Sequence, residues 1–246
     1  MTSARLDDNS RFGQFDTYRV TAAYLAPRTL AGASVKLRAS YGTGAKSPGL
    51  YQLFDPTYGN ANLTTAESKG VDAGIDFAWD RAHLQITAFQ NKVENEIGFG
   101  LGGGPLGLFG YLNLGETETK GVELGADYRV ADWFTLAQSF TVLDAQNALT
   151  NTWLGRPRYA GVTTATLTPS DRWSFTARIR YRSKNNSSYG GTTDSYATGD
   201  LLASYRLNDH IELYGRVVNV TDEFYEMSYG INTAGRSGYV GVRARF

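Results

Sequence analysis

The stretch that decides the fold is Trp173-Ser-Phe-Thr-Ala-Arg-Ile-Arg-Tyr-Arg182, in which every second residue is apolar. In an extended chain, one face would carry the tryptophan, phenylalanine, alanine, isoleucine and tyrosine. The other face would carry the serine, the threonine and the arginines. Successive side chains of a strand point to opposite faces, so this alternation predicts a β-strand with one apolar and one polar face.

The same period of two recurs along the whole chain. It is found at 35–41, 71–79, 122–130, 201–205 and 240–246. Less regular strands are expected near 14–26, 82–97, 133–145, 157–168 and 210–221. Together with 173–182, these segments predict an all-β protein with about eleven antiparallel strands and no helix.

The connections between the strands alternate between short and long. Short ones fall at 27–32, 80–81, 131–132, 169–172 and 208–209, and long ones at about 43–66, 98–108, 146–156, 183–195 and 222–235. Tight turns at one rim and long loops at the other are the layout of an up-and-down transmembrane β-barrel. A soluble sandwich with Greek-key crossings has no reason to keep this order.

Aromatic residues with a polar edge lie beside the short turns: Tyr24, Trp79, Tyr128, Trp133, Trp173 and Tyr205. Such rings are stable where lipid meets water, so they predict a membrane girdle at the short-turn rim. The opposite face of the strands is charged, which suits a water-filled or plugged interior. The residues expected there are Lys36, Arg38, Asp72, Asp76, Glu123, Asp127, Arg178, Arg180 and Arg206.

The composition argues against several classes of protein. The 246 residues include 24 basic and 24 acidic ones, whereas a nucleic-acid binder normally has a basic excess. There is no cysteine, and no apolar run approaches the roughly 18 residues of a membrane-spanning helix. No spacing suggests a catalytic set, so neither an enzyme nor a cofactor is expected.

Three local motifs are better explained without a ligand. Residues 98–103 match a dinucleotide fingerprint, but no helix is predicted to follow, so a flexible outer loop is expected. The run Asp7-Asp8-Asn9 is interpreted as a solvated loop edge, and no metal site is expected there. His83 is interpreted as a single histidine of the interior or the rim.

The first residues lie within the strand pattern. Residues 4–6 resemble the end of a preceding strand that enters a loop at 7–13. Single-chain bacterial barrels have an even number of strands, so eleven predicts the C-terminal portion of a longer protein. In the alternative, a self-sufficient small barrel, residues 2–6 would form a twelfth strand.

Three stretches carry a family resemblance. The first is Lys46-Ser-Pro-Gly-Leu50 followed by Gly59-Asn-Ala-Asn-Leu63 and Glu67-Ser68. The second is Asn113-Leu-Gly-Glu-Thr-Glu-Thr-Lys-Gly-Val-Glu123, where Glu116 and Glu118 depart from the more usual pattern. The third is Asn219-Val-Thr-Asp-Glu-Phe-Tyr225 with Ala234-Gly-Arg236. The sequence resembles the TonB-dependent outer-membrane receptors, most closely the branch that transports cobalamin.

The resemblance implies that residues 1–246 form the C-terminal half of a 22-stranded barrel, without its plug domain and N-terminal strands. It implies the outer membrane of a Gram-negative bacterium and uptake of a scarce corrinoid or metal chelate. The implied partners are membrane lipid, the TonB complex acting through the plug, and the barrel-assembly machinery. Phe246 resembles the terminal signal that this machinery reads.

Residues for ligand binding are expected in the long loops. Arg156 and Tyr189 fall where the cobalamin branch has ligand-contacting residues. Tyr51, Tyr58, Trp153 and Tyr229 offer large rigid rings that give contact area at little entropic cost. Packing of the loops against themselves is an equally good explanation of these rings. A passive porin-like channel is the alternative function, and a soluble β-sheet binding module is a further alternative.

Overall fold

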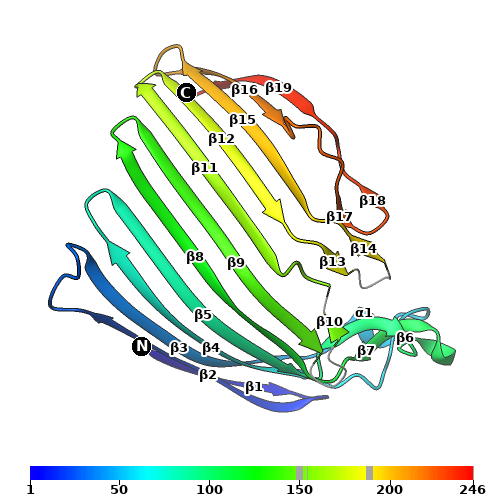
Figure 1. The fold of residues 1–246 in the computed structure, drawn as a ribbon. Coiled ribbons are helices and arrows are strands. Elements are labelled where there is room, and N and C mark those ends of the chain that lie inside the picture. Colours follow the sequence, from blue (N-terminus) through cyan, green and yellow to red (C-terminus); the bar gives the residue numbers. More distant parts are fainter. Residues whose placement is uncertain (148–151, 154, 187–190, 246) are drawn as a thin grey trace.

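The computed structural model describes residues 1–147, 152–153, 155–186 and 191–245, with the backbone alone described at 152 and 153. A 13-stranded antiparallel sheet makes up most of this part (Figure 1). Twelve of its strands lie side by side in the same order as in the sequence. They are β1 (Thr2–Asn9), β2 (Gly13–Leu25), β3 (Ser34–Lys46), β4 (Ala66–Ala78), β5 (Ala82–Glu94), β8 (Thr117–Ala131), β9 (Phe134–Asn147), β11 (Tyr159–Ser170), β12 (Trp173–Arg182), β15 (Tyr196–Arg206), β16 (Ile211–Val218) and β19 (Ser237–Ala244).

The remaining elements lie in the long connections. The short strand β10 (Thr152–Trp153) pairs with β9. Three two-stranded hairpins and two short helical turns lie off the sheet: β6 (Ile97–Leu101) with β7 (Phe109–Asn113), β13 (Asn185–Asn186) with β14 (Thr192–Thr193), β17 (Glu226–Ser228) with β18 (Ile231–Asn232), α1 (Leu50–Phe54) and the 3₁₀ turn Pro105–Gly107. No helix of the described segments has the length and apolar character needed to cross a membrane.

The predicted alternation of connections is confirmed. Tight turns join β4 to β5, β8 to β9 and β11 to β12 at one end of the sheet, at the upper left of Figure 1. The elaborated loops that hold α1, β6, β7, β13, β14, β17 and β18 all lie at the other end. These ends are called the short-turn rim and the long-loop rim below.

The N-terminal segment differs from the expectation. Residues 2–9 form a complete strand, so the described sheet has twelve long strands where eleven were expected, and Asp7 and Asp8 belong to a strand and not to a loop. The turn is confined to residues 10–12, because Asn9 Oδ1 accepts hydrogen bonds from the backbone amides of Arg11 and Phe12 at 3.0 and 3.1 Å. The two residues expected to mark a loop instead pair with Phe15 and Gln14 of β2.

Two further expectations for the loops were wrong. The helix α1 forms within the 47–65 connection, where Gln52 Oε1 accepts a hydrogen bond from the Gly49 amide at 2.9 Å. The glycine-rich segment 98–103 is not a plain loop, because most of it belongs to β6, which pairs with β7. Glycine allows this hairpin to pack tightly, since a side chain on Gly104 or Gly110 would collide with backbone atoms.

Strand register keeps most apolar and charged side chains on separate faces of the sheet. Leu37 pairs with Ile75, and Ile75 pairs with Ile86. Farther along the sheet, Ile179 pairs with Gly199 and Leu213 with Val242. The charged residues occupy the alternate positions, so that Arg38 lies across from Gly74 and Arg178 across from Asp200. The sheet therefore has one mainly apolar face and one mainly polar face.

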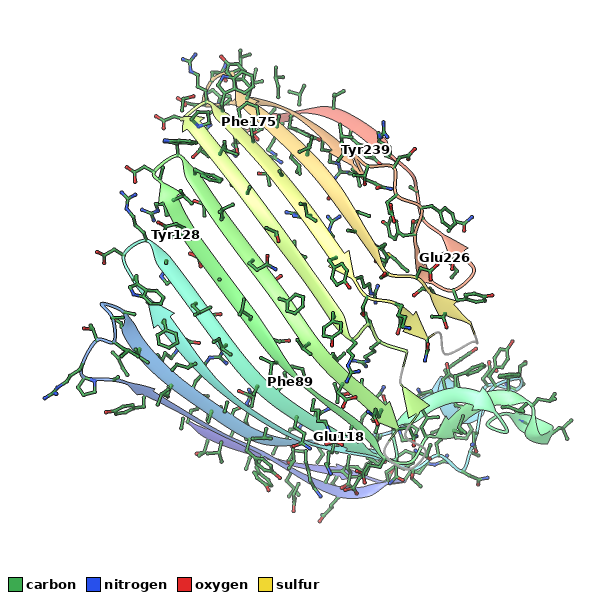
Figure 2. The ribbon with its side chains drawn as sticks, viewed as in Figure 1. Phe89, Glu118, Tyr128, Phe175, Glu226 and Tyr239 are labelled. Atoms are coloured by element: carbon green, nitrogen blue, oxygen red, sulfur yellow. The ribbon has the colours of Figure 1, made fainter. Side chains whose placement is uncertain are left out.

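The apolar face is not covered by a second layer of the described structure. Trp173, Phe175 and Ile179 remain 43%, 39% and 58% exposed, whereas Asp200 on the polar face is 4% exposed. Figure 2 shows Tyr128 and Phe175 near the short-turn rim, and Glu118 and Glu226 near the long-loop rim. A sandwich would bury its apolar face between two sheets. This arrangement is the reverse of a soluble β-sandwich.

The loop after β16 is tied to the sheet by a buried asparagine. Asn219 is 1% exposed and has a φ of 53°, a left-handed conformation that asparagine tolerates. Its amide Nδ2 donates to the Glu223 carbonyl at 2.8 Å, and its Oδ1 accepts from the Glu223 amide at 3.0 Å. Its backbone amide donates to Asp200 at 3.1 Å. Asp222 then accepts from the Arg236 amide at 2.7 Å, which joins the start and the end of the loop.

Replacing Gly121 with alanine is expected to destabilise the sheet. A Cβ there would collide with the Val142 carbonyl oxygen and would lie 2.9 Å from the Phe89 ring. We expect Gly121→Ala to lower the free energy of unfolding by about 1–3 kcal/mol. Gly125 is the matched control, because it lies on the same face of β8 and its Cβ would lie 3.8 Å from the nearest atom. Guanidinium titration of the complete protein in detergent measures the stability of the Gly121→Ala and Gly125→Ala variants. Equal stabilities of the two variants would contradict the close packing at Gly121.

Replacing Asn219 is expected to loosen the 219–236 loop. Asn219→Ala removes both side-chain hydrogen bonds and places alanine at a positive φ, at a cost of about 1–3 kcal/mol. Asn219→Gly keeps the positive φ accessible, so its effect on stability reports the loss of the side-chain hydrogen bonds alone. Amide hydrogen exchange at Glu223 should accelerate in both variants. Asn232→Ala, at an exposed position of the same loop, should leave it unchanged, and unaltered exchange in the Asn219 variants would argue against the anchor.

Candidate ligand-binding loops

Two of the predicted ligand-binding residues lie together in one aromatic cluster at the long-loop rim. Tyr51 packs edge-on against Tyr111, with ring centroids 6.1 Å apart. Tyr58 packs against Phe99 at 5.4 Å, and Phe99 packs against Tyr111 at 5.4 Å. The cluster therefore joins the 47–65 loop to the β6–β7 hairpin, two segments far apart in the sequence.

Backbone contacts hold these two loops in place. The Tyr111 amide donates to the Tyr58 carbonyl at 2.9 Å, and Asn60 Nδ2 donates to the Tyr111 carbonyl at 2.9 Å. Asn113 Nδ2 donates to the carbonyls of Thr64 and Asn95, at 3.1 and 2.7 Å. The two loops therefore form an ordered platform. Asparagine side chains hydrogen-bond backbone groups of these loops that would otherwise need a partner strand.

A third loop joins the same platform. The Arg11 guanidinium, in the β1–β2 turn, donates to the Ala61 carbonyl at 2.7 Å and lies 5.1 Å from the centre of the Phe54 ring. Inside the platform Leu53 and Leu63 are buried, at 4% and 3% exposed. These two leucines form part of an apolar interior within the platform.

Tyr51 presents a neutral phenol on this platform. Partial desolvation raises the pKa of Tyr51, and the nearby Asp55 carboxylate raises it further. The side chain nevertheless remains 58% exposed, and that of Tyr58 remains 40% exposed. Each ring therefore combines packing within the loop with an open surface that offers a protonated hydroxyl or an apolar face.

Tyr229 belongs to a different loop cluster. It follows β17, and its ring lies against Gly191, where an added Cβ would come within 2.6 Å of the ring atoms. Close by in the chain, Tyr225 stacks on Tyr196 with ring centroids 4.3 Å apart. Tyr229 is 54% exposed. This second cluster joins the β16–β19 loop to the β12–β15 loop.

The other three predicted ligand-binding residues are described only in part. Arg156 is exposed in the segment between β10 and β11. Trp153 is placed through its backbone, which pairs with Gln146. Tyr189 lies outside the described residues, as does Phe246, the predicted assembly signal. Of the predicted residues whose side chains are described, Tyr51 and Tyr58 share one loop cluster and Tyr229 belongs to another.

The polar face carries several ion pairs. Arg38 Nε donates to Asp76 at 3.0 Å, and Arg38 Nη2 donates to the Thr87 hydroxyl. Arg180 lies 2.7 Å from Asp200. His83 was expected to be an isolated histidine of the interior or the rim. Its Nδ1 lies 3.0 Å from Asp127 Oδ2. Within the described ranges, no group of three or more histidine, aspartate or glutamate side chains could hold a metal ion.

The predicted girdle residues lie at the short-turn rim of the apolar face, where several of them stack. Trp173 lies 4.5 Å from Tyr205 and 5.4 Å from Phe175 between ring centroids, and Trp79 lies 5.8 Å from Phe77. The Trp79 indole nitrogen donates to the Ala31 carbonyl at 3.0 Å.

A second set of aromatic residues was not predicted. Tyr18, Tyr41, Tyr159 and Tyr181 lie on the apolar face towards the long-loop rim, with Tyr18 and Tyr41 5.8 Å apart. Trp173 and Tyr181 therefore bracket most of β12, a strand of 10 residues. A strand that crosses a bilayer at a tilt needs about 9–11 residues. These tyrosines occupy the apolar positions of their strands, so the same alternation predicts them.

Comparison with known proteins gives a consistent result. The family described as TonB dependent receptor-like, beta-barrel matches residues 1–220. The vitamin B12 transporter BtuB of Vibrio vulnificus (strain YJ016) is 28% identical over 97% of this chain and 37% of its own length. The fold is similar to that of the ferric enterobactin receptor PfeA of Pseudomonas aeruginosa, with a TM-score of 0.82 and 20% identity over 99% of this chain and 42% of that one.

Two other solved structures share the fold. The copper transporter OprC gives a TM-score of 0.81 at 17% identity, over 95% of this chain and 40% of that one. The siderophore receptor PirA of Pseudomonas aeruginosa gives 0.75 at 22% identity, over 98% and 42%. The chain thus spans about two-fifths of the length of the proteins that it matches. By its sequence and by its two-faced antiparallel sheet, the chain belongs to the TonB-dependent receptor-like β-barrel family.

Proposed function

We propose that this chain supplies the C-terminal half of a 22-stranded outer-membrane barrel, in a TonB-dependent receptor that takes up a scarce corrinoid or metal chelate. The observation that carries the proposal is the single curved sheet whose apolar face is exposed along its whole width and whose charged face is opposite. Only lipid makes such an apolar face favourable to expose. The arrangement supports a transporter wall rather than an enzyme.

The two edges of the sheet support the larger barrel. In the described part, β1 pairs only with β2, and β19 pairs only with β16. Edge strands in hydrocarbon would leave backbone amides and carbonyls without partners, at several kcal/mol each. Further strands are therefore expected to join both edges. A plug domain would fill the interior and contact the TonB complex, and the barrel-assembly machinery would insert the protein.

The loops support the ligand-binding role. The platform around Tyr51 and Tyr58 and the cluster around Tyr229 rise from the same rim, which would face the outside of a Gram-negative cell. Arg156, Trp153 and Tyr189 belong to connections at that rim. The named relatives are a vitamin B12 transporter, a copper transporter and a ferric enterobactin receptor, which supports a bulky or metal-containing ligand.

The decisive experiment is ligand binding and uptake by the complete receptor, with corrinoids and ferric chelates compared side by side in cells with and without TonB. TonB-dependent accumulation of one ligand class supports the proposal. Ion conductance in planar bilayers without TonB would instead support the alternative, a passive porin-like channel. Heat-modifiable migration on gels tests barrel closure independently.

A lysine on the apolar face is expected to destabilise the membrane-inserted protein. Leu124 lies between Ile86 and Phe140 on that face, so Leu124→Lys should cost about 2–4 kcal/mol in lipid vesicles. Ser139→Lys is the matched control, because Ser139 lies on the polar face of the adjacent strand and is exposed. Guanidinium titration of vesicle-inserted protein measures both. Equal losses would show that the apolar face does not meet lipid.

Removing the Tyr51 ring is expected to weaken ligand binding by the complete receptor. Its open face suits a contact with a bulky ligand, and truncation of such an anchor costs about 1–2 kcal/mol. Tyr128→Ala, at the short-turn rim, should bind normally. Limited proteolysis of the 47–65 loop separates a lost contact from a lost loop structure. Wild-type affinity in Tyr51→Ala would show that Tyr51 acts only in loop packing.

A further inference from the structure

The C-terminal side of the polar face carries an excess of arginine. The strands β12, β15, β16 and β19 contain six arginines and two acids. The arginines are Arg178, Arg180, Arg182, Arg206, Arg216 and Arg243, and the acids are Asp200 and Glu212. Strand register places them on the polar face, where Arg178 lies across from Asp200 and Arg206 across from Glu212. This side of the polar face is therefore positively charged.

Both acids already have partners within the sheet. Asp200 is 4% exposed, lies 2.7 Å from Arg180 and accepts a hydrogen bond from the Asn219 amide at 3.1 Å. Glu212 lies 3.1 Å from Arg243. The two carboxylates are therefore taken up by contacts that hold the strands and the 219–236 loop together.

Three of the arginines have no acid beside them. Among the described residues, Arg178, Arg206 and Arg216 form no ion pair. Arg178 is partly exposed, and the other two are exposed. The Arg216 guanidinium stacks over the Tyr239 ring, with its Cζ 4.4 Å from the ring centre. This contact orients the guanidinium but leaves its N–H groups free to bind an anion.

These three arginines and Arg180 are called the arginine band below. Arg180 lies near the long-loop end of β12, whereas the Arg206 amide bonds the Arg172 carbonyl at the short-turn rim. Eight positions of β12 separate these two levels, so the band extends about 26 Å along the sheet. Arg178 and Arg216 lie at levels between them. The band therefore follows the direction in which a ligand would cross the proposed barrel.

The chemistry of the band selects an anion. Guanidinium groups present paired N–H donors that match the oxygens of carboxylates and phosphates. Cations of like sign along one strand also repel each other, and an anion between them removes this repulsion. A docked protein surface would need carboxylates fixed at matching positions over the whole band. A small anion can instead contact successive arginines in turn.

We propose that the arginine band binds a metal chelate of net negative charge, through its anionic oxygens, as the chelate passes along the polar face. The inference rests on the proposed function, because this face must line the passage that the ligand takes. It narrows the transported ligand to an anion and assigns a contact site below the loops, on the wall itself.

The test is isothermal titration calorimetry of the complete receptor in uncharged detergent, with inorganic pyrophosphate as the probe. The wild type should bind pyrophosphate. Arg178→Gln/Arg216→Gln should bind it about 100-fold more weakly, or about tenfold for each arginine removed. Arg178→Lys/Arg216→Lys keeps the charge and should bind more tightly than the glutamine variant. No binding by the wild type, or equal binding by all three proteins, would overturn the inference.

Arg19→Gln/Arg129→Gln is the matched control, because it removes two exposed arginines of the same polar face outside the band. This control should bind pyrophosphate as the wild type does. An equal loss in the control would show a general effect of charge and would overturn the inference.

Chemical modification of the wild type tests the band without any substitution. Phenylglyoxal modifies accessible guanidinium groups, so Arg178 and Arg216 should react, and pyrophosphate should slow their reaction. Arginines that stay unreactive without pyrophosphate would be covered by other parts of the receptor, such as an acidic surface of the plug, which would overturn the inference.

Uptake experiments separate this inference from the proposed function. A ligand that cells accumulate through TonB should compete with pyrophosphate for the receptor. Accumulation of a ligand that does not compete refutes this inference alone. Pyrophosphate binding at the band without TonB-dependent uptake of any corrinoid or ferric chelate refutes the proposed function alone.

Discussion

The structure depends on one constraint, the register that keeps most apolar and charged side chains on opposite faces from β2 to β19. Because side chains alternate along a strand, a slip of one residue in any pairing would move arginines such as Arg180 into the apolar rows. Each tight turn at the short-turn rim fixes one such register. The long loops are under no comparable constraint, since they leave the sheet before they change direction. This division explains why one rim is simple and the other is elaborate.

The loops of the long-loop rim need a source of order other than a common core, because the sheet below them is a single layer. Side chains of asparagine provide it. Asn60, Asn113 and Asn219 each hydrogen-bond the backbone of a distant or returning segment, and each lies within one of the stretches that carry the family resemblance. The motifs can therefore be explained physically as loop anchors. Buried backbone groups that lack a sheet partner must be paired in some way, and an amide side chain offers both a donor and an acceptor.

Most of the sheet could be predicted from the sequence, because apolar and polar residues alternate without interruption in strands such as 173–182. Prediction failed where the alternation is weak, and where contacts between segments far apart in the sequence determine the structure. Strand β1 carries polar residues on both faces at Asp7 and Asp8, so its pairing is fixed by β2 rather than by its own pattern. The β6–β7 hairpin depends on glycines that pack against each other and against the 47–65 loop. The grouping of Tyr51 with Tyr58, and the separation of Tyr229 from both, arise from contacts between loops that no local pattern encodes.

The edges of the sheet limit the environments in which it is stable. A polar face is stable in water and an apolar face is stable in lipid. An unpaired strand edge is stable only in water, because water can hydrogen-bond its backbone groups. The β1 edge is polar, with Arg5 and Asp7 paired at 2.6 Å on one face, whereas β19 carries Val240 and Val242, 91% and 65% exposed, on the other. In the described part, the outer edge of β19 has no strand beside it. In the proposed barrel, a further strand would pair the backbone groups of that edge, which hydrocarbon could not do.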